Sequence, residues 1–268
     1  MQPKGHVVKK SLAAIVVTTV CAGLLSGCVS TTAVEVKLPD QTSRSDPLRS
    51  AQIHTERSAE YYRLGNLAVA LEAARQALAA VPNYAPAHNM LGIIYMQLQD
   101  DAQAAQSFEQ ALRLAPNDSE TLNNYGWFVC QRQNPANAMQ YFQAALKNPL
   151  YSTPEKPYNN AGICVLSRGD YKSAEEFFQK TLSLRPADSQ ALIGMAEVNF
   201  RSGNLAAAKS NLSRHMQISV PTAESLWLGI QIERKTGDRH AEASYTMQLQ
   251  KRFPDSKEAA ALRDGRFE

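Results

Sequence analysis

A pattern of small, aromatic and proline residues returns about every 34 residues along this 268-residue chain, and it constrains the fold more than any other feature. Residues 85–118 show it most completely, with small residues at Gly92 and Ala104, an aromatic residue at Phe108 and a closing Pro116. Small residues let two helices approach closely, and a bulky ring fills the space beside them. Proline ends the second helix because it cannot continue the hydrogen-bond ladder. Each unit is therefore predicted to be a helical hairpin.

The unit resembles the tetratricopeptide repeat. The predicted repeats are residues 51–84, 85–118, 119–152, 155–188, 189–222 and 223–256. A short capping helix is predicted in the tail after them. A single hairpin cannot bury its apolar face, whereas stacked hairpins share a continuous core. The predicted fold is all-α, a right-handed superhelical solenoid of about six tetratricopeptide repeats in a domain of residues 50–268, with Phe108, Phe142 and Phe178 in its core.

Positions within each 34-residue repeat are numbered here as places, from its first residue. In the first helix of each repeat, the places that do not pack in the core indicate what the repeats bind. In this type of repeat the second, fifth, ninth and twelfth places line the inner groove. Three consecutive repeats have asparagine at the fifth place, and an amide can bond the main chain of an extended peptide through both donors and an acceptor. Apolar side chains at the ninth and twelfth places form a stripe beside them. The predicted partner-binding residues are Tyr62, Asn89, Ile93, Met96, Asn123, Trp127, Asn159, Ile163 and Leu166.

Two alternatives stay open for this groove. The asparagines can instead bond neighbouring helices, as is expected for the sixth-place Asn124 and Asn160, and a carboxy-terminal repeat or loop can fold over the stripe. The groove lacks a cluster of Lys and Arg, so it does not resemble a clamp for a terminal carboxylate. The interior of a peptide or strand is the better-matched ligand.

The sequence contains no pattern that predicts catalysis. None of its five histidines stands in a metal-binding spacing, and neither a nucleophile motif nor a phosphate-binding loop is present. We therefore predict no enzyme, no cofactor, no metal and no small-molecule substrate. Cys130 and Cys164 stand at the twelfth and tenth places of neighbouring repeats, so their side chains are expected to point in different directions. Buried free thiols are the favoured interpretation, and a disulfide is the alternative.

The amino-terminal segment has a basic start, an apolar core and then Leu25-Ser26-Gly27-Cys28. At roughly 15 residues the apolar core is too short to span a bilayer, but it is typical of a signal peptide. The four residues resemble a bacterial lipobox, in which the thiol of Cys28 takes up a diacylglycerol. Residues 1–27 are therefore predicted to be a lipoprotein signal peptide and residues 28–49 an acylated, flexible tether. An ordinary secretory signal is the alternative.

Charge and the residue after Cys28 narrow the location. Removing the leader takes three of the 28 Lys and Arg and none of the 25 Asp and Glu, which leaves a balanced body. Balanced charge argues against nucleic acid as a partner, because binding it requires a concentrated basic surface. Val29 does not resemble the aspartate that retains lipoproteins in the inner membrane. We expect an outer-membrane protein, anchored by lipid and facing the periplasm.

Four segments resemble the PilF/PilW family: LNNYGWF (122–128), YNNAGIC (158–164), SLWLGIQIER (225–234) and GDRHAEASYTMQLQKRFPDS (237–256). This resemblance implies an outer-membrane lipoprotein scaffold, or pilotin, needed for type IV pilus biogenesis and twitching motility. It implies the pilus secretin PilQ, or a similar protein, as the partner, whose localisation and multimerisation the scaffold promotes. Cys28 is the residue that matches the family's lipid anchor. The family offers no signature for the secretin contact, so the groove residues remain a hypothesis from the sequence itself.

Two other functions are alternatives to that of a pilotin. The first is another periplasmic tetratricopeptide lipoprotein scaffold, such as an outer-membrane protein assembly subunit or a protease adaptor. The second is a cell-wall enzyme with a hidden site. Gene deletion separates the scaffolds, because loss of secretin multimers indicates a pilotin and a general loss of porins indicates an assembly subunit.

Overall fold

The computed structural model describes residues 46–267, and these residues form thirteen α-helices with no strand among them. The helices are α1 (Pro47–Arg63), α2 (Leu67–Ala80), α3 (Ala85–Gln97), α4 (Asp101–Leu114), α5 (Ser119–Arg132), α6 (Pro135–Ala145), α7 (Glu155–Leu166), α8 (Tyr171–Leu184), α9 (Ser189–Arg201), α10 (Leu205–Ile218), α11 (Ala223–Thr236), α12 (Arg239–Arg252) and α13 (Lys257–Arg263). None of the described helices is long and apolar enough to cross a membrane. The predicted signal peptide and Cys28 lie outside the described residues.

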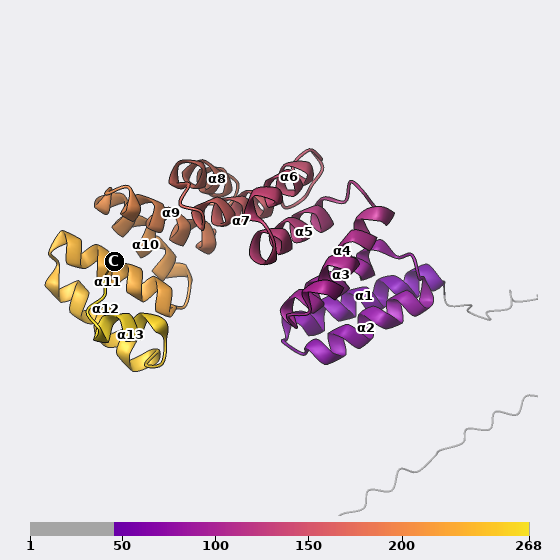
Figure 1. The fold of residues 1–268 in the computed structure, drawn as a ribbon, viewed down its shortest axis with the longest axis horizontal. Helices are drawn as coiled ribbons and strands as arrows, with labels where there is room; N and C mark the ends of the chain where they lie inside the picture. The colour runs from indigo at the N-terminus through magenta and orange to yellow at the C-terminus, as the bar shows by residue number, and fades with distance from the viewer. Residues whose placement is uncertain (1–45, 268) are drawn as a thin grey trace, which may run out of the picture. The chain divides into compact units, whose positions relative to one another are not determined.

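Consecutive helices pair into six hairpins, from α1 with α2 to α11 with α12 (Figure 1). Each hairpin packs mainly on the one before and the one after it, and α13 closes the series by packing on α11 and α12. Contacts between sequence neighbours alone are what a stack of repeated units produces. The predicted all-α solenoid of tetratricopeptide repeats is confirmed.

The first helix begins earlier than the sequence interpretation placed it. Helix α1 starts at Pro47, inside the segment 28–49 that was expected to be a tether. Asp46 explains this start, because its side chain accepts a hydrogen bond from the Leu48 amide at 3.0 Å. Proline at the first helical position loses no hydrogen bond there, so Asp-Pro is a strong signal for a helix start.

The aromatic residues at the repeated place form the core, as predicted. Phe108, Phe142 and Phe178 are at most 1% exposed. The ring of Phe178 lies between two glycines of neighbouring first helices, Gly162 on α7 and Gly194 on α9. A methyl group added at Gly194 would overlap that ring, so packing requires glycine at this place.

The interpretation of Cys130 and Cys164 as free thiols is wrong, because the two residues form a disulfide. Their Cα atoms are 6.0 Å apart, a separation typical of disulfides. Helices α5 and α7 pack side by side, and each turns a different side toward the other. Residues at different places of the repeat therefore meet. The bond joins the third hairpin covalently to the fourth.

Candidate functional site

Two adjacent pockets lie along the first helices of the second to fourth hairpins, and both are lined by Asn124 and Trp127. The one we call the apolar pocket has a volume of about 350 Å³ and is lined by Tyr62, Ile93, Met96, Gln97, Phe108, Asn124, Trp127 and Arg132. The one we call the amide pocket has a volume of about 340 Å³ and is lined by Glu120, Asn123, Asn124, Trp127, Glu155, Lys156, Asn159, Asn160, Arg185 and Asp188. We refer to the two together as the groove. Each volume falls in the lower part of the range of ligand sites.

The structure brings most of the predicted partner-binding residues to this groove. Four of them line the apolar pocket: Tyr62, Ile93, Met96 and Trp127. Asn123 and Asn159 line the amide pocket, which Trp127 also lines. Three predicted residues line neither pocket: Asn89, Ile163 and Leu166. Ile163 and Leu166 are partly buried and pack against the buried cluster around Phe178.

A ladder of asparagine side chains connects the first helices beneath the groove. The Asn124 amide donates to Asn89 Oδ1 at 3.2 Å, and the Asn160 amide donates to Asn123 Oδ1 at 3.0 Å. Asn123 in turn donates to Asn124 Oδ1 at 3.3 Å. In both links between repeats, a fifth-place asparagine accepts from the sixth-place asparagine of the next repeat. The alternative that these asparagines bond neighbouring helices therefore describes Asn89 and Asn123.

Asn159 ends the ladder without a partner. Its Oδ1 atom is buried and accepts no hydrogen bond from the described residues. The sixth place of the next repeat is Gly194, which has no amide to offer and which Phe178 prevents from being larger. A buried acceptor left unpaired costs about 1–3 kcal/mol. A ligand N–H reaching into the amide pocket would remove this cost.

Four of the five charged residues that line the amide pocket form two ion pairs, and the fifth, Asp188, accepts a hydrogen bond from the Ala191 amide at 2.9 Å. Glu120 lies 2.9 Å from the Lys156 ammonium and accepts a hydrogen bond from the Tyr151 hydroxyl at 2.8 Å. Glu155 lies 3.9 Å from the Arg185 guanidinium. Burial, reinforced by Glu120, raises the pKa of Tyr151, so its hydroxyl stays a donor at neutral pH. With three carboxylates and two cations, the rim has no excess of positive charge to attract an anion, and its paired groups suit a polar ligand such as a peptide main chain.

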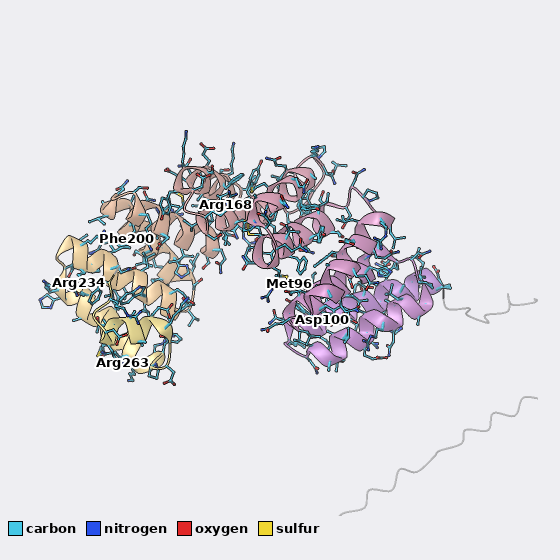
Figure 2. All side chains as sticks on the ribbon, in the orientation of Figure 1. Met96, Asp100, Arg168, Phe200, Arg234 and Arg263 are labelled. Carbon is cyan, nitrogen blue, oxygen red and sulfur yellow. A yellow bond between two sulfur atoms is a disulfide. The ribbon has the colours of Figure 1, made fainter. Side chains whose placement is uncertain are left out.

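The apolar pocket offers hydrocarbon surface beside that main-chain site. Ile93, Met96 and Trp127 are half-buried and pack on the core cluster of the second and third hairpins. Met96 is labelled in Figure 2 on α3. Burial raises the pKa of Tyr62, whose side chain lines the pocket. An apolar side chain of a bound segment fits this surface.

The described residues contain no cluster of three or more His, Cys, Asp or Glu side chains arranged to hold a metal ion. The chemistry that the groove does offer is amide hydrogen bonding next to an apolar surface. Such an arrangement can accept the main chain and the apolar side chains of a protein segment.

Comparison with known proteins identifies the repeat and its relatives. Two families, each described as tetratricopeptide repeat, match the chain, one over residues 56–119 and 102–157 and the other over residues 165–217. The type IV pilus assembly protein PilF of Pseudomonas aeruginosa is 28% identical over 112 residues, which are 42% of this chain and 44% of that protein. The alignment therefore spans less than half of that relative's length.

Two solved structures are similar over nearly their whole length. The crystal structure of PilW, described as a widely conserved type IV pilus biogenesis factor, is 33% identical with a TM-score of 0.72, and the match covers 79% of this chain and 97% of that one. The structure of Pseudomonas aeruginosa PilF is 25% identical with a TM-score of 0.73, covering 82% and 99%.

Proposed function

This chain belongs to the PilF/PilW family of tetratricopeptide repeat proteins of type IV pilus biogenesis, and we propose that it is an outer-membrane pilotin for the pilus secretin. In this proposal the groove binds a segment of PilQ or of a similar secretin. Binding promotes the localisation and multimerisation of secretin subunits. The observation that supports the groove as the binding site is the unpaired acceptor of Asn159 in the same pocket as Trp127.

An extended segment satisfies both parts of the groove at once. Its main-chain N–H donates to Asn159 Oδ1 in the amide pocket. Side chains of an extended chain alternate in direction, so a neighbouring apolar side chain packs on Trp127 and enters the apolar pocket. The main-chain contact supplies affinity for any extended segment, and the apolar pocket selects among sequences.

The lipid anchor supplies the second part of the proposed mechanism. Cys28, which lies outside the described residues, carries the diacylglycerol, and no other cofactor is involved. The chain then concentrates the captured secretin at the outer membrane, since tethering raises the local concentration of the complex. The Cys130–Cys164 disulfide is consistent with a location in the oxidising periplasm. The role is that of a scaffold, with no catalytic step.

Photo-crosslinking in cells tests which surface binds the secretin. A benzoylphenylalanine residue at Ile93 places the crosslinker in the apolar pocket, and the same residue at Gln103 places it on the exposed side of the second helix in the same region. We expect the position-93 variant to capture the secretin and the position-103 variant not to. Capture from position 103 alone, or capture of porins and not of the secretin, would contradict the proposal.

Replacing Cys28 by serine tests the anchor. Serine cannot form the thioether to diacylglycerol, so the Cys28→Ser chain is expected to leave the outer-membrane fraction. Cell fractionation and mass spectrometry of the amino-terminal peptide measure this change. Cys21→Ser is the matched control, because Cys21 lies in the predicted leader and should leave acylation intact. Membrane retention of the Cys28→Ser chain would show that the anchor is elsewhere.

A further inference from the structure

The last described residues of the chain turn back onto α11 (Figure 1). There Phe267 makes three specific contacts. Its ring stacks on Trp227, with centroids 5.5 Å apart and planes inclined by 16°. The guanidinium of Arg234 lies 3.7 Å from the centre of the same ring. The carbonyl oxygen of Phe267 accepts a hydrogen bond from Gln231 Nε2 at 3.1 Å.

The three residues that hold Phe267 stand at groove places of the sixth repeat. Trp227, Gln231 and Arg234 are at the fifth, ninth and twelfth places of α11. Ile93 and Met96 occupy the ninth and twelfth places of α3 and line the apolar pocket. Phe267 therefore contacts, in the sixth repeat, the ninth and twelfth places that in the second repeat line an open pocket, and it contacts the fifth place as well.

Phe267 packs on the core cluster of the last hairpin from its partly exposed edge, whereas helix α13 provides the fully buried residue that closes this core. Helix α13 performs that closure, since Ala259 is buried in the cluster that contains Leu226 and Leu249. Phe267 lies beyond Gly265, whose φ of 67° ends the helix and turns the chain back. Its ring remains half-buried, and Arg234, labelled in Figure 2, is exposed. A ring held in this way can leave without opening the hairpin.

We propose that Trp227, Gln231 and Arg234 form a binding site for an aromatic residue in an extended protein segment, and that Phe267 fills this site until a partner's aromatic residue displaces it. Two groups of the bound segment are recognised. Its main-chain carbonyl accepts a hydrogen bond from Gln231, and its aromatic ring lies between the Trp227 indole and the Arg234 guanidinium. Because the tail is attached to the site, it competes at a high effective concentration. Partner binding is therefore weaker whenever the tail is docked.

The chemistry of the site selects aromatic over aliphatic side chains. Indole stacking requires a planar partner, and attraction to a guanidinium requires the negative face of a ring. Arg234 is also held by Glu242, whose carboxylate lies 3.3 Å from its Nη1 atom, so the cation is already positioned when a ring arrives. Phenylalanine and tyrosine satisfy both demands, whereas leucine satisfies neither.

Emptying the site in the full mature chain tests the proposal. The probe is a fluorescein-labelled, carboxy-amidated peptide Ala-Leu-Arg-Asp-Gly-Arg-Phe, which copies residues 261–267, and its binding is measured by fluorescence anisotropy. We expect the Phe267→Ala chain to bind this peptide at least tenfold more tightly than the unaltered chain does. Arg266→Ala is the matched control, because Arg266 pairs with Asp264 at the surface and its loss should leave the tail docked.

Two further comparisons identify the site and the ligand class. Adding Arg234→Ala or Trp227→Ala to the Phe267→Ala chain is expected to weaken peptide binding at least tenfold, and circular dichroism verifies that each variant is folded. A peptide ending in leucine is expected to bind at least tenfold more weakly than one ending in phenylalanine, and one ending in tyrosine to bind about as well.

Equal peptide binding by the unaltered and Phe267→Ala chains would overturn the proposal, and so would equal binding of the leucine peptide. If the Trp227→Ala variant does not fold, the Arg234→Ala variant gives the test, because Arg234 is exposed. Unchanged peptide binding by a folded Arg234→Ala variant would also overturn the proposal. This inference does not rest on the identity of the secretin as partner. Crosslinking from position 93 tests the apolar pocket of the second repeat, whereas the peptide assay tests the sixth repeat. The secretin proposal and the aromatic-site proposal can therefore be confirmed or refuted independently.

Discussion

Replacing Trp127 by alanine is expected to weaken binding of the secretin by about 30-fold or more, which corresponds to a loss of ~2 kcal/mol at a central aromatic residue. Trp127 is the residue where the largest effect is expected because it lines both pockets of the groove. Its removal takes away the aromatic side chain that both pockets share. Titration of the purified secretin's periplasmic region into the purified chain measures the change in Kd.

Two control variants separate the groove from the fold. Trp127→Phe keeps part of the apolar contact and is expected to lose less affinity, whereas Gln103→Ala on α4 is expected to bind as the unaltered chain does. Asn159→Ala is the preferred variant for the amide pocket, since the Oδ1 atom it removes bonds nothing in the described structure. Asn123→Ala would instead break the hydrogen bond from Asn160. An unchanged Kd in the Trp127→Ala chain would exclude the groove as the secretin site.

Removing the disulfide by replacing Cys130 and Cys164 with alanine is expected to lower the free energy of unfolding by about 3–4 kcal/mol. The bond closes a loop between residues 34 positions apart, and the chain-entropy relation gives a value of this size for such a loop. Alanine is the suitable replacement at Cys164, because that side chain is fully buried and serine would add a buried hydroxyl group. Urea denaturation followed by circular dichroism measures the difference.

A reducing agent provides the matched control for this prediction. It should destabilise the unaltered chain to a similar extent and leave the double alanine variant unchanged. Because each hairpin contacts mainly its neighbours, the loss should be greatest between the third and fourth hairpins, where hydrogen exchange can locate it. Equal stability of the oxidised and reduced forms would mean that the bond does not constrain the unfolded chain.

The fold was predictable from the sequence because its contacts are local. A repeat of about 34 residues fixes which residues face inward in each hairpin, and neighbouring hairpins then share one core. Phe108, Phe142 and Phe178 illustrate this, since a single repeated place predicted their burial correctly. The groove was partly predictable for the same reason: groove places brought Ile93, Met96 and Trp127 to the same region.

The side-chain contacts between the first helices of neighbouring repeats could not be predicted from the positions of the residues within the repeat. Each helix turns one side toward the helix before it and another toward the helix after it, so the residues that meet occupy different places. Cys130 therefore meets Cys164 although their places differ. A signal was present in the asparagines, where a fifth-place residue in one repeat is followed by a sixth-place residue in the next, and Asn89 bonds Asn124 in this manner.

The docking of the tail had no signal in the repeat pattern. The sequence predicted a capping helix, and α13 confirms it. The return of Phe267 to Trp227 depends on the turn at Gly265 and on one aromatic contact. Glycine turns of this kind also follow earlier helices, at Gly65 and Gly203 for example, so the turn alone does not predict the contact. A structural feature that is not part of the 34-residue repeat depends on individual contacts, and those contacts are seen only in the structure.

The interruption of the asparagine ladder at Gly194 gives the groove two unlike ends. At one end the amides already bond each other, and at the other end the buried Asn159 Oδ1 atom has no hydrogen-bond partner among the described residues. A strand that donated to Asn159 and placed an apolar side chain on Trp127 would be held at two unlike points, which would fix its register and its direction. Subunits captured in this way would all be presented in the same orientation, which is the condition that identical pieces must meet before they can close into a symmetric ring.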